Sequence, residues 1–160
     1  MTTHLSYTRD VVACVVTDGE SVCLVRRSEW VAYDQGRWHC VTGYIEPGET
    51  PAQSARVELL EELGLNDNAI DELTCGPVLS YHESMTLWRV HTFLVHTKRA
   101  PFQLNWENDD YRWASPNHSM EGCVPWLADV YRGLLCSLTP PPREEKPGFS
   151  LLAWKPRFEE

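Results

Sequence analysis

"GYIEPGETPAQSARVELLEELGL", residues 43–65, carries five of the fifteen glutamates in this 160-residue chain. Its second half predicts a helix over 51–63. Thr50 is a good N-cap, Pro51 suits the first helical position, and Gly64 is a natural C-terminal stop. The stretch therefore predicts a loop followed by a helix whose two ends are both defined by sequence.

Three of these glutamates, Glu58, Glu61 and Glu62, fall in the last turns of the expected helix. A helix C-terminus already carries partial negative charge, and like charges three or four positions apart repel by roughly 0.2–0.5 kcal/mol per pair. At 100° per residue, Glu61 and Glu62 lie within about 60° of Glu58, beside the stripe formed by Leu59 and Leu63 that docks on the sheet. A cluster that costs folding energy and points one way indicates binding rather than packing.

Hard divalent cations such as Mg²⁺ prefer oxygen ligands, usually a few carboxylates together with substrate phosphates. A metal ion would turn the repulsion among the three glutamates into a binding site. Gly43 lets the backbone approach closely, so its carbonyl is a further candidate ligand. Pro47 and Gly48 form a turn that swings Glu49 back towards the helix. The segment is therefore predicted to bind a divalent metal.

Apolar and turn patterns predict the remaining elements. The expected strands are 10–16 and 22–27, joined as a hairpin at Asp18-Gly19, then 38–43, 76–82, 86–97 and an edge strand within 102–116, and a second helix is expected over 124–138. This order predicts an α/β (α+β) fold with a mixed sheet between helices. We expect one domain over 1–138 and a proline-rich tail over 139–160, whose apolar end could dock back or support a homodimer.

The composition of the chain limits the kinds of function that it can have. A net charge of −9 argues against general nucleic-acid binding, because a phosphate backbone attracts a basic surface. It is compatible with a small polyphosphate that enters with divalent cations. The six cysteines show no metal-ligand spacing, and no signal peptide or apolar run of about 20 residues is visible. We therefore expect a cytoplasmic protein with reduced thiols and no membrane association.

Residues 43–65 resemble the motif of the Nudix hydrolases, G-x5-E-x7-R-E-U-x-E-E-x-G-U, in which U is apolar. Eight of its nine specified positions match, from Gly43 to Leu65. The flanks are similar as well, because a hairpin ending in VRR precedes the motif and an acid-rich loop closed by Arg112-Trp113 follows it. A chance match of this length is very rare.

The resemblance implies an α/β/α sandwich that hydrolyses a diphosphate linked to another moiety. Water attacks phosphorus in such enzymes, and Mg²⁺ or Mn²⁺ neutralises the developing charge and activates the nucleophile. The roles implied by position are metal ligand and catalytic acid or base for Glu58, Glu61 and Glu62, metal ligand for Gly43, and orientation of the site for Glu49. The expected cofactor is Mg²⁺, with Mn²⁺ as an alternative.

Similar enzymes often add a carboxylate from a later loop. Glu107, in NWENDDYRW, is the best match as a further metal ligand and catalytic residue, with Asp109 and Asp110 as substitutes. One departure stands out, because the arginine expected before the first helix glutamate is Val57. Arg56 lies about 160° round the helix from that glutamate and cannot replace it. The departure keeps a non-catalytic, nucleotide-binding regulatory module open beside the favoured working enzyme.

The candidate substrate-binding residues are Arg26, Arg27, Trp38, Tyr81 and Trp88, with Trp30 as a further candidate for stacking on a base. The two arginines end a strand where similar enzymes contact phosphate. The tyrosine lies 16 residues beyond the motif, as in similar enzymes that act on diadenosine polyphosphates. This favours a nucleoside diphosphate derivative, a dinucleoside polyphosphate first. Nucleoside triphosphates, ADP-ribose and pterin triphosphates stay open as alternatives.

Overall fold

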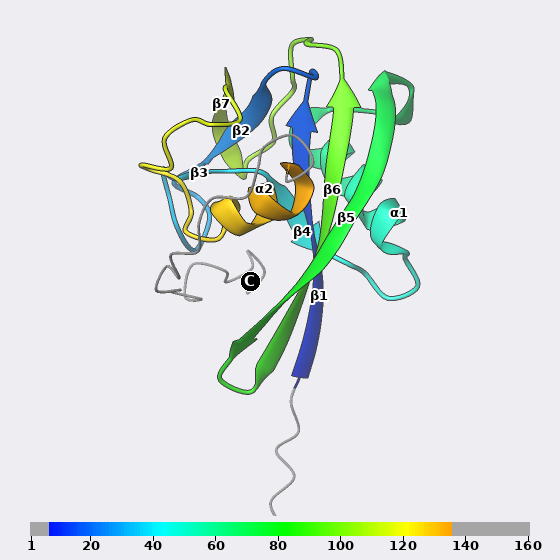
Figure 1. Cartoon of the computed structure of the whole chain (residues 1–160), viewed down its shortest axis with the longest axis vertical. Helices are drawn as coiled ribbons and strands as arrows, with labels where there is room; N and C mark the ends of the chain where they lie inside the picture. Colours follow the sequence, from blue (N-terminus) through cyan, green and yellow to red (C-terminus); the bar gives the residue numbers. More distant parts are fainter. Residues whose placement is uncertain (1–6, 136–160) are drawn as a thin grey trace, which may run out of the picture.

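The computed structural model describes residues 7–135, which form a seven-stranded mixed sheet with one helix on each face (Figure 1). In chain order the elements are β1 (Tyr7–Thr17), β2 (Val22–Arg27), β3 (Trp38–His39), β4 (Val41–Tyr44), α1 (Pro51–Leu63), a one-turn 3-10 helix (Asp67–Ala69), β5 (Ile70–Glu83), β6 (Thr86–Thr97), β7 (Asn108–Ala114) and α2 (Leu127–Leu135). The predicted α+β sandwich with a mixed sheet is confirmed. The tail predicted over 139–160 and the domain end at 138 lie outside the described residues.

β1 is the central strand of the sheet. One of its edges is covered by β6, which runs parallel to it from Tyr7–Thr86 to Thr17–His96. The other edge is shared: β4 pairs with it antiparallel over residues 11–14, and β2 pairs with it only at Val16–Cys23 and Thr17–Val22. The predicted hairpin of β1 and β2 is confirmed, but it is short because β2 turns away to pair with β3 and β7.

The two faces of the sheet carry separate apolar cores, because alternate residues of a strand point to opposite sides. Val12, Cys14 and Val16 pack with Ala55, Leu59 and Leu63 in what we call the α1 core. Val11, Ala13 and Val15 pack with Leu127, Val130 and Leu134 in what we call the α2 core. Both faces of β1 are therefore buried, as its almost continuous apolar sequence requires.

Helix α1 has the ends that the sequence predicts. The side chain of Thr50 accepts a hydrogen bond from the Gln53 amide, and the Gln53 side chain accepts one from the Thr50 amide, which completes a capping box. At the other end Gly64 adopts a left-handed conformation with φ 67°, and its N–H donates to the Leu60 carbonyl at 2.9 Å. These caps fix where the last two turns, and their glutamates, stand on the sheet.

Strand β1 begins at Tyr7 rather than at residue 10, and larger differences from the prediction occur at β3–β4, β5 and α2. The segment 38–43 forms two strands, β3 and β4, which pair with β2 and β1 respectively. Strand β5 begins at Ile70 rather than 76, because an exposed edge strand can pair along β6 without the apolar pattern that marks a buried one. Helix α2 begins at Leu127 rather than 124, and the Val124 amide donates to the Trp38 carbonyl at 2.9 Å, which ties the residues before the helix to β3.

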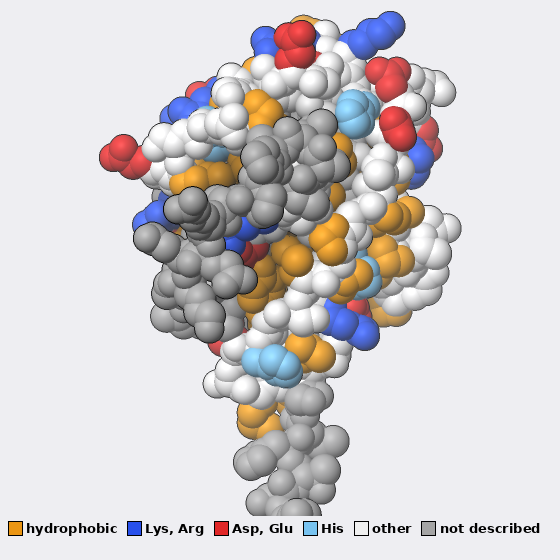
Figure 2. Space-filling view, viewed as in Figure 1, with side chains coloured by type: hydrophobic (Ala, Val, Ile, Leu, Met, Phe, Trp, Pro, Cys, Tyr) orange, Lys and Arg blue, Asp and Glu red, His pale blue; other side chains and the backbone are white. Residues whose placement is uncertain are grey.

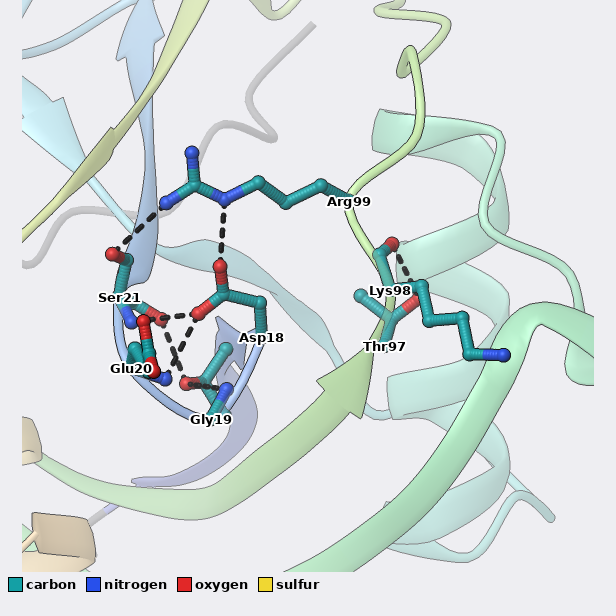
Figure 3. Close-up of polar contacts among 8 residues, drawn as sticks. Asp18, Gly19, Glu20, Ser21, Thr97, Lys98 and Arg99 are labelled. Atoms are coloured by element: carbon teal, nitrogen blue, oxygen red, sulfur yellow. Dashed lines mark hydrogen bonds and ion pairs between the residues drawn. The ribbon is translucent and has the colours of Figure 1, made fainter.

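The turn between β1 and β2 is tied to the segment that follows β6 (Figure 3). Asp18 accepts hydrogen bonds from the amides of Glu20 and Ser21 at 2.9 and 2.7 Å. Its other oxygen accepts one from the Arg99 side chain at 2.6 Å. These backbone donors, with Arg99, lower the pKa of Asp18 to about 2. The guanidinium also lies 4.9 Å from the centre of the Trp113 ring, so it links three segments.

On the face that carries α2, apolar side chains gather beside the helix, and most charged side chains lie towards the rim (Figure 2). Five described cysteines are free, four of them buried and Cys75 exposed, which agrees with the expectation of reduced thiols. Within residues 7–135, no helix has the length and apolar character needed to cross a membrane.

Candidate active site

Glu62 is fully buried, and both of its carboxylate oxygens accept hydrogen bonds. Asn108 Nδ2 donates to Oε1 at 3.0 Å, and the Thr42 amide donates to Oε2 at 3.3 Å. The Asn108 Oδ1 atom lies 2.9 Å from His39 Nε2. Because Asn108 donates through its nitrogen, its oxygen accepts, and His39 Nε2 therefore carries the proton. Helix α1 is joined in this way to β4, β7 and β3.

Glu58 lies against the backbone of Gly43 on β4. A Cβ atom added to Gly43 would come within 2.0 Å of both Cδ and Oε1 of Glu58, so a larger residue would displace the carboxylate. Glu58 is 8% exposed. Below the two acids, burial raises the pKa of the Cys14 thiol well above its usual range, and the negative charges of Cys40, Glu62 and Glu58 add to the shift. Cys14 belongs to the α1 core, so the two acids lie beside buried apolar side chains.

The remaining glutamates of the motif are more open. Glu61 is exposed, and the half-buried Glu49 accepts a hydrogen bond from the Ser54 hydroxyl at 2.7 Å, which ties the loop to the start of α1. Val57 is 41% exposed. Arg56 forms an ion pair with Asp67 at 3.0 Å, so it does not take the place of the missing arginine.

Glu107 is buried at the end of the loop before β7, with 6% of its surface exposed. Its carbonyl accepts a hydrogen bond from the Ser28 amide at 2.8 Å, and the next residue is Asn108, the partner of Glu62. The two substitute acids point elsewhere, because Asp109 is paired with Arg26 at 2.7 Å and Asp110 is exposed. Of the three loop acids, Glu107 is therefore the one buried beside the Glu62 network.

The candidate substrate residues are not all brought together. Arg26 and Trp38 are paired across β2 and β3, and the guanidinium lies 5.7 Å from the centre of the indole. Arg112 stacks on the same ring at 4.3 Å. Arg27 is buried instead, and its Nε donates to the Tyr33 carbonyl at 2.8 Å. Arg26 is partly exposed and paired with Asp109, whereas Arg27 supports the loop that follows it.

Tyr81 and Trp88 face each other on β5 and β6. The Tyr81 hydroxyl donates to Asp129 on α2 at 3.1 Å, and burial, followed by the negative charge of Asp129, raises the pKa of Tyr81. Trp88 is 7% exposed and lies 6.4 Å from Tyr44 between ring centres, and its buried indole N–H has no partner among residues 7–135. Trp88 thus belongs to the α2 core, and Tyr81 lies at its border.

In the part of the chain that the structure describes, no three side chains of His, Cys, Asp or Glu gather into a ready-formed metal site. The donor chemistry nevertheless suits a hard divalent cation, because the glutamates of α1 and the Gly43 carbonyl offer oxygen atoms alone. Gly43 adds a specific sign of fit, since the space that a Cβ would fill is occupied by the Glu58 carboxylate. The residues present therefore fit Mg²⁺ or Mn²⁺.

Asn108 and His39 were missed by the sequence reasoning. Neither belongs to the 43–65 motif, and the contact between Glu62 and Asn108 spans 46 residues. The one usable sign was Asn108 standing next to Glu107 in an acid-rich loop. A polar residue in such a loop is ordinarily solvated, so the sequence alone did not distinguish a buried partner from a surface residue.

This chain has a loop and helix that bury two glutamates against a mixed sheet, and the sheet lies between two helices. These features are typical of proteins with the Nudix fold. The NUDIX domain family model matches residues 7–133, which is most of the chain. The chain therefore belongs to the Nudix family, and it is a hydrolase that acts on phosphoanhydride bonds.

Relatives and solved structures agree with this assignment. An RNA pyrophosphohydrolase from Yersinia enterocolitica is 29% identical over 126 residues, covering 68% of this chain and 72% of the relative. A Caenorhabditis elegans Ap4A hydrolase, solved as a binary complex, superposes with a TM-score of 0.61 at 18% identity, covering 82% of this chain and 97% of that one. The NUDIX domain of Shewanella oneidensis NrtR, solved with ADP ribose, gives 0.67 at 14% identity, covering 87% and 94%.

Proposed function

We propose that this Nudix hydrolase is a Mg²⁺- or Mn²⁺-dependent pyrophosphohydrolase that cleaves a phosphoanhydride bond of a nucleoside diphosphate derivative, with dinucleoside polyphosphates as the first substrate class. The observation that carries the proposal is the packing of Glu58 against Gly43 beside the hydrogen-bonded Glu62. Two buried acids at the end of a helix cost folding energy, and metal and phosphate binding would offset that cost.

Glu58, Glu61, Glu62 and the Gly43 carbonyl would hold the metal, with Glu107 as a ligand from the loop before β7. When bound, the metal supplies charge neutralisation and lowers the pKa of the attacking water. Glu62 keeps a fixed orientation through Asn108 and Thr42. Glu61 is exposed and can accept a proton from water, which suits a general base.

The substrate class rests on neighbours and on the arginine cluster. The C. elegans Ap4A hydrolase shares the fold, and Arg26 and Arg112 present two guanidiniums at one indole, where phosphate oxygens could accept hydrogen bonds. The name of the Yersinia relative favours a second candidate, an RNA chain with a 5′-terminal polyphosphate. A short 5′ end would avoid the general repulsion between RNA and a protein of net charge −9.

ADP-ribose, nucleoside triphosphates and pterin triphosphates are further candidate substrates. ADP-ribose is supported by the complex of the NrtR domain, and the two kinds of triphosphate contain the same type of scissile bond. The rival of another class is a non-catalytic nucleotide-binding module, which Val57 in place of the motif arginine keeps open. A cytoplasmic location and a homodimer built through the tail over 139–160 also remain predictions.

The test is hydrolysis of a panel of substrates with Mg²⁺, with Mn²⁺ and with EDTA, in which the products (nucleotides, ribose 5-phosphate or pyrophosphate) are separated by ion-exchange chromatography. The panel holds diadenosine tetraphosphate, a 5′-triphosphorylated dinucleotide, ATP and ADP-ribose. We expect metal-dependent turnover that is highest on diadenosine tetraphosphate. Tight nucleotide binding without turnover under either metal would overturn the enzyme proposal, and turnover confined to the dinucleotide would move the assignment to RNA ends.

A further inference from the structure

Two indoles stand exposed where β2 ends and β7 begins. Trp30 is 75% exposed and Trp106 is 53% exposed, the largest values among the tryptophans that the structure describes. Neither ring belongs to the α1 core or the α2 core. Large apolar surface left in water at one place is typical of a binding surface, and fold stability gives no reason for it here.

Ser28 joins the two loops that carry these rings. Its hydroxyl donates to the Trp106 carbonyl at 2.6 Å, and its amide donates to the Glu107 carbonyl at 2.8 Å. The Trp30 amide in turn donates to the Ser28 hydroxyl at 3.2 Å. Ser28 is itself buried, so the backbones of both tryptophans belong to one hydrogen-bonded unit.

The loop that carries Trp30 is ordered by its own contacts. Val31 is buried and anchors the loop, and the Gln35 side chain donates to the Val31 carbonyl at 2.7 Å. Arg27 Nε donates to the Tyr33 carbonyl, and the Gly36 amide donates to the Arg27 carbonyl, both at 2.8 Å. A loop backbone held in place before a ligand arrives loses little conformational entropy on binding.

Trp106 adjoins the acidic site, and the Trp30 backbone is tied to that of Trp106 through Ser28. Trp106 directly precedes Glu107 and lies two residues before Asn108, the partner of Glu62, so its Cα is within about 7.6 Å of that of Asn108. Each indole offers an apolar π face and no positive charge to a phosphate. An uncharged, flat group fits this position better than an anion.

We propose that Trp30 and Trp106 stack on a nucleobase of the substrate, while its phosphates lie at the Glu58–Glu62 site. This inference rests on the proposed function and deepens it, because it names residues that distinguish a nucleotide from a bare polyphosphate. Stacking depends little on which base is present, since every base has a π face. The two indoles would therefore select substrates that contain a nucleobase, without distinguishing one base from another.

The kinetic test compares Trp30→Ala, Trp106→Ala and the double variant on diadenosine tetraphosphate and on inorganic tripolyphosphate. The matched control is Tyr7→Ala, which removes a 66% exposed ring at the start of β1. We expect each tryptophan variant to raise KM for the nucleotide by about 5- to 100-fold. The value of kcat, the reaction with tripolyphosphate and the control should stay near those of the wild type. An unchanged KM, or equal losses on both substrates, would overturn the proposal.

A binding test separates this proposal from the proposed function. ADP and inorganic pyrophosphate are titrated against the same variants by calorimetry in the presence of Mg²⁺. We expect the tryptophan variants to weaken ADP and leave pyrophosphate unaffected. That result supports stacking even if no substrate is turned over. If the enzyme turns over substrate but its affinity for ADP does not depend on either indole, the stacking proposal is overturned and the proposed function stands.

Discussion

Asn108 donates from Nδ2 to Oε1 of Glu62 at 3.0 Å, and this contact joins β7 to the last turn of α1. With the Thr42 amide on the other oxygen, Glu62 is held at both ends of its carboxylate. Glu61, one position earlier, is exposed. The side chain of Glu62 is therefore held by hydrogen bonds, whereas that of Glu61 lies in solvent. Substituting each one should separate the structural role of these glutamates from their chemical role.

Glu62→Gln should lower both stability and activity. The new amide group would face either Asn108 Nδ2 or the Thr42 amide, so one buried donor would lose its acceptor, at a cost of about 1–3 kcal/mol. Activity should fall by orders of magnitude. Urea unfolding and the rate of diadenosine tetraphosphate hydrolysis measure the two effects. Glu61→Gln is the control, with a similar loss of activity but a stability change within about 0.5 kcal/mol. Equal stability of the two variants would contradict the network.

Gly43→Ala should displace the Glu58 carboxylate, because the added Cβ would overlap it. We expect a loss of about 1–3 kcal/mol in unfolding free energy, as for other overpacked sites, and at least a tenfold loss of kcat (about 1.4 kcal/mol in the barrier). The loss of stability should shrink in a Glu58→Ala background, where the overlapping atoms are gone. An additive double-mutant cycle would show that the clash lies elsewhere.

Val57→Arg should leave turnover unchanged or raise it. The position is 41% exposed, so the longer side chain has room, and stability should change by no more than about 0.5 kcal/mol. Leu60→Arg is the matched control, because it adds the same charge at a 54% exposed position one turn further on. Initial rates with diadenosine tetraphosphate compare the two. A tenfold loss in Val57→Arg alone would mean that another residue already does what the arginine of the motif does in similar enzymes.

Asp18 should make stability depend on acid pH. Its folded-state pKa of about 2 lies below the value of about 3.9 expected in the unfolded chain, so its contribution is complete above pH 4 and is lost as the pH falls towards 2. After allowance for solvent screening, the contribution is about 1 kcal/mol. Urea unfolding of the wild type and Asp18→Asn at pH 7 and pH 2.5 should show a difference that shrinks at the lower pH. A constant difference would exclude the ionised turn as its cause.

The sequence predicted the helix of the motif to the residue because all of its determinants are local. Thr50 and Gln53 set its start and Gly64 sets its end, each through hydrogen bonds to residues only a few positions away. The predicted start of β5 was wrong because an exposed edge strand is defined by the strand it pairs with rather than by its own apolar pattern. Asn108 was missed for the related reason that its partner stands 46 residues away.

The alternation of side chains along a strand also explains which face of the sheet each candidate substrate-binding residue occupies. Trp38 and His39 are neighbours in sequence, yet Trp38 packs against the α2 core and His39 reaches the Glu62 network through Asn108. Size and aromatic character marked Trp88 as a candidate, but such residues are equally typical of a core. Burial depends on the whole sheet, so composition could not separate these roles.

The parallel pairing of β1 with β6 has a consequence for biosynthesis. Asp10 and Arg89, which are bonded across these strands, stand 79 residues apart. Strand β6 covers the edge of β1 opposite β4, so the sheet beneath the glutamates is complete only after β6 has been synthesised. A 13-residue helix is marginal on its own in water, and distant pairings slow folding. The acids of α1 should therefore become organised late, and a ribosome-bound chain shorter than β6 should lack the site.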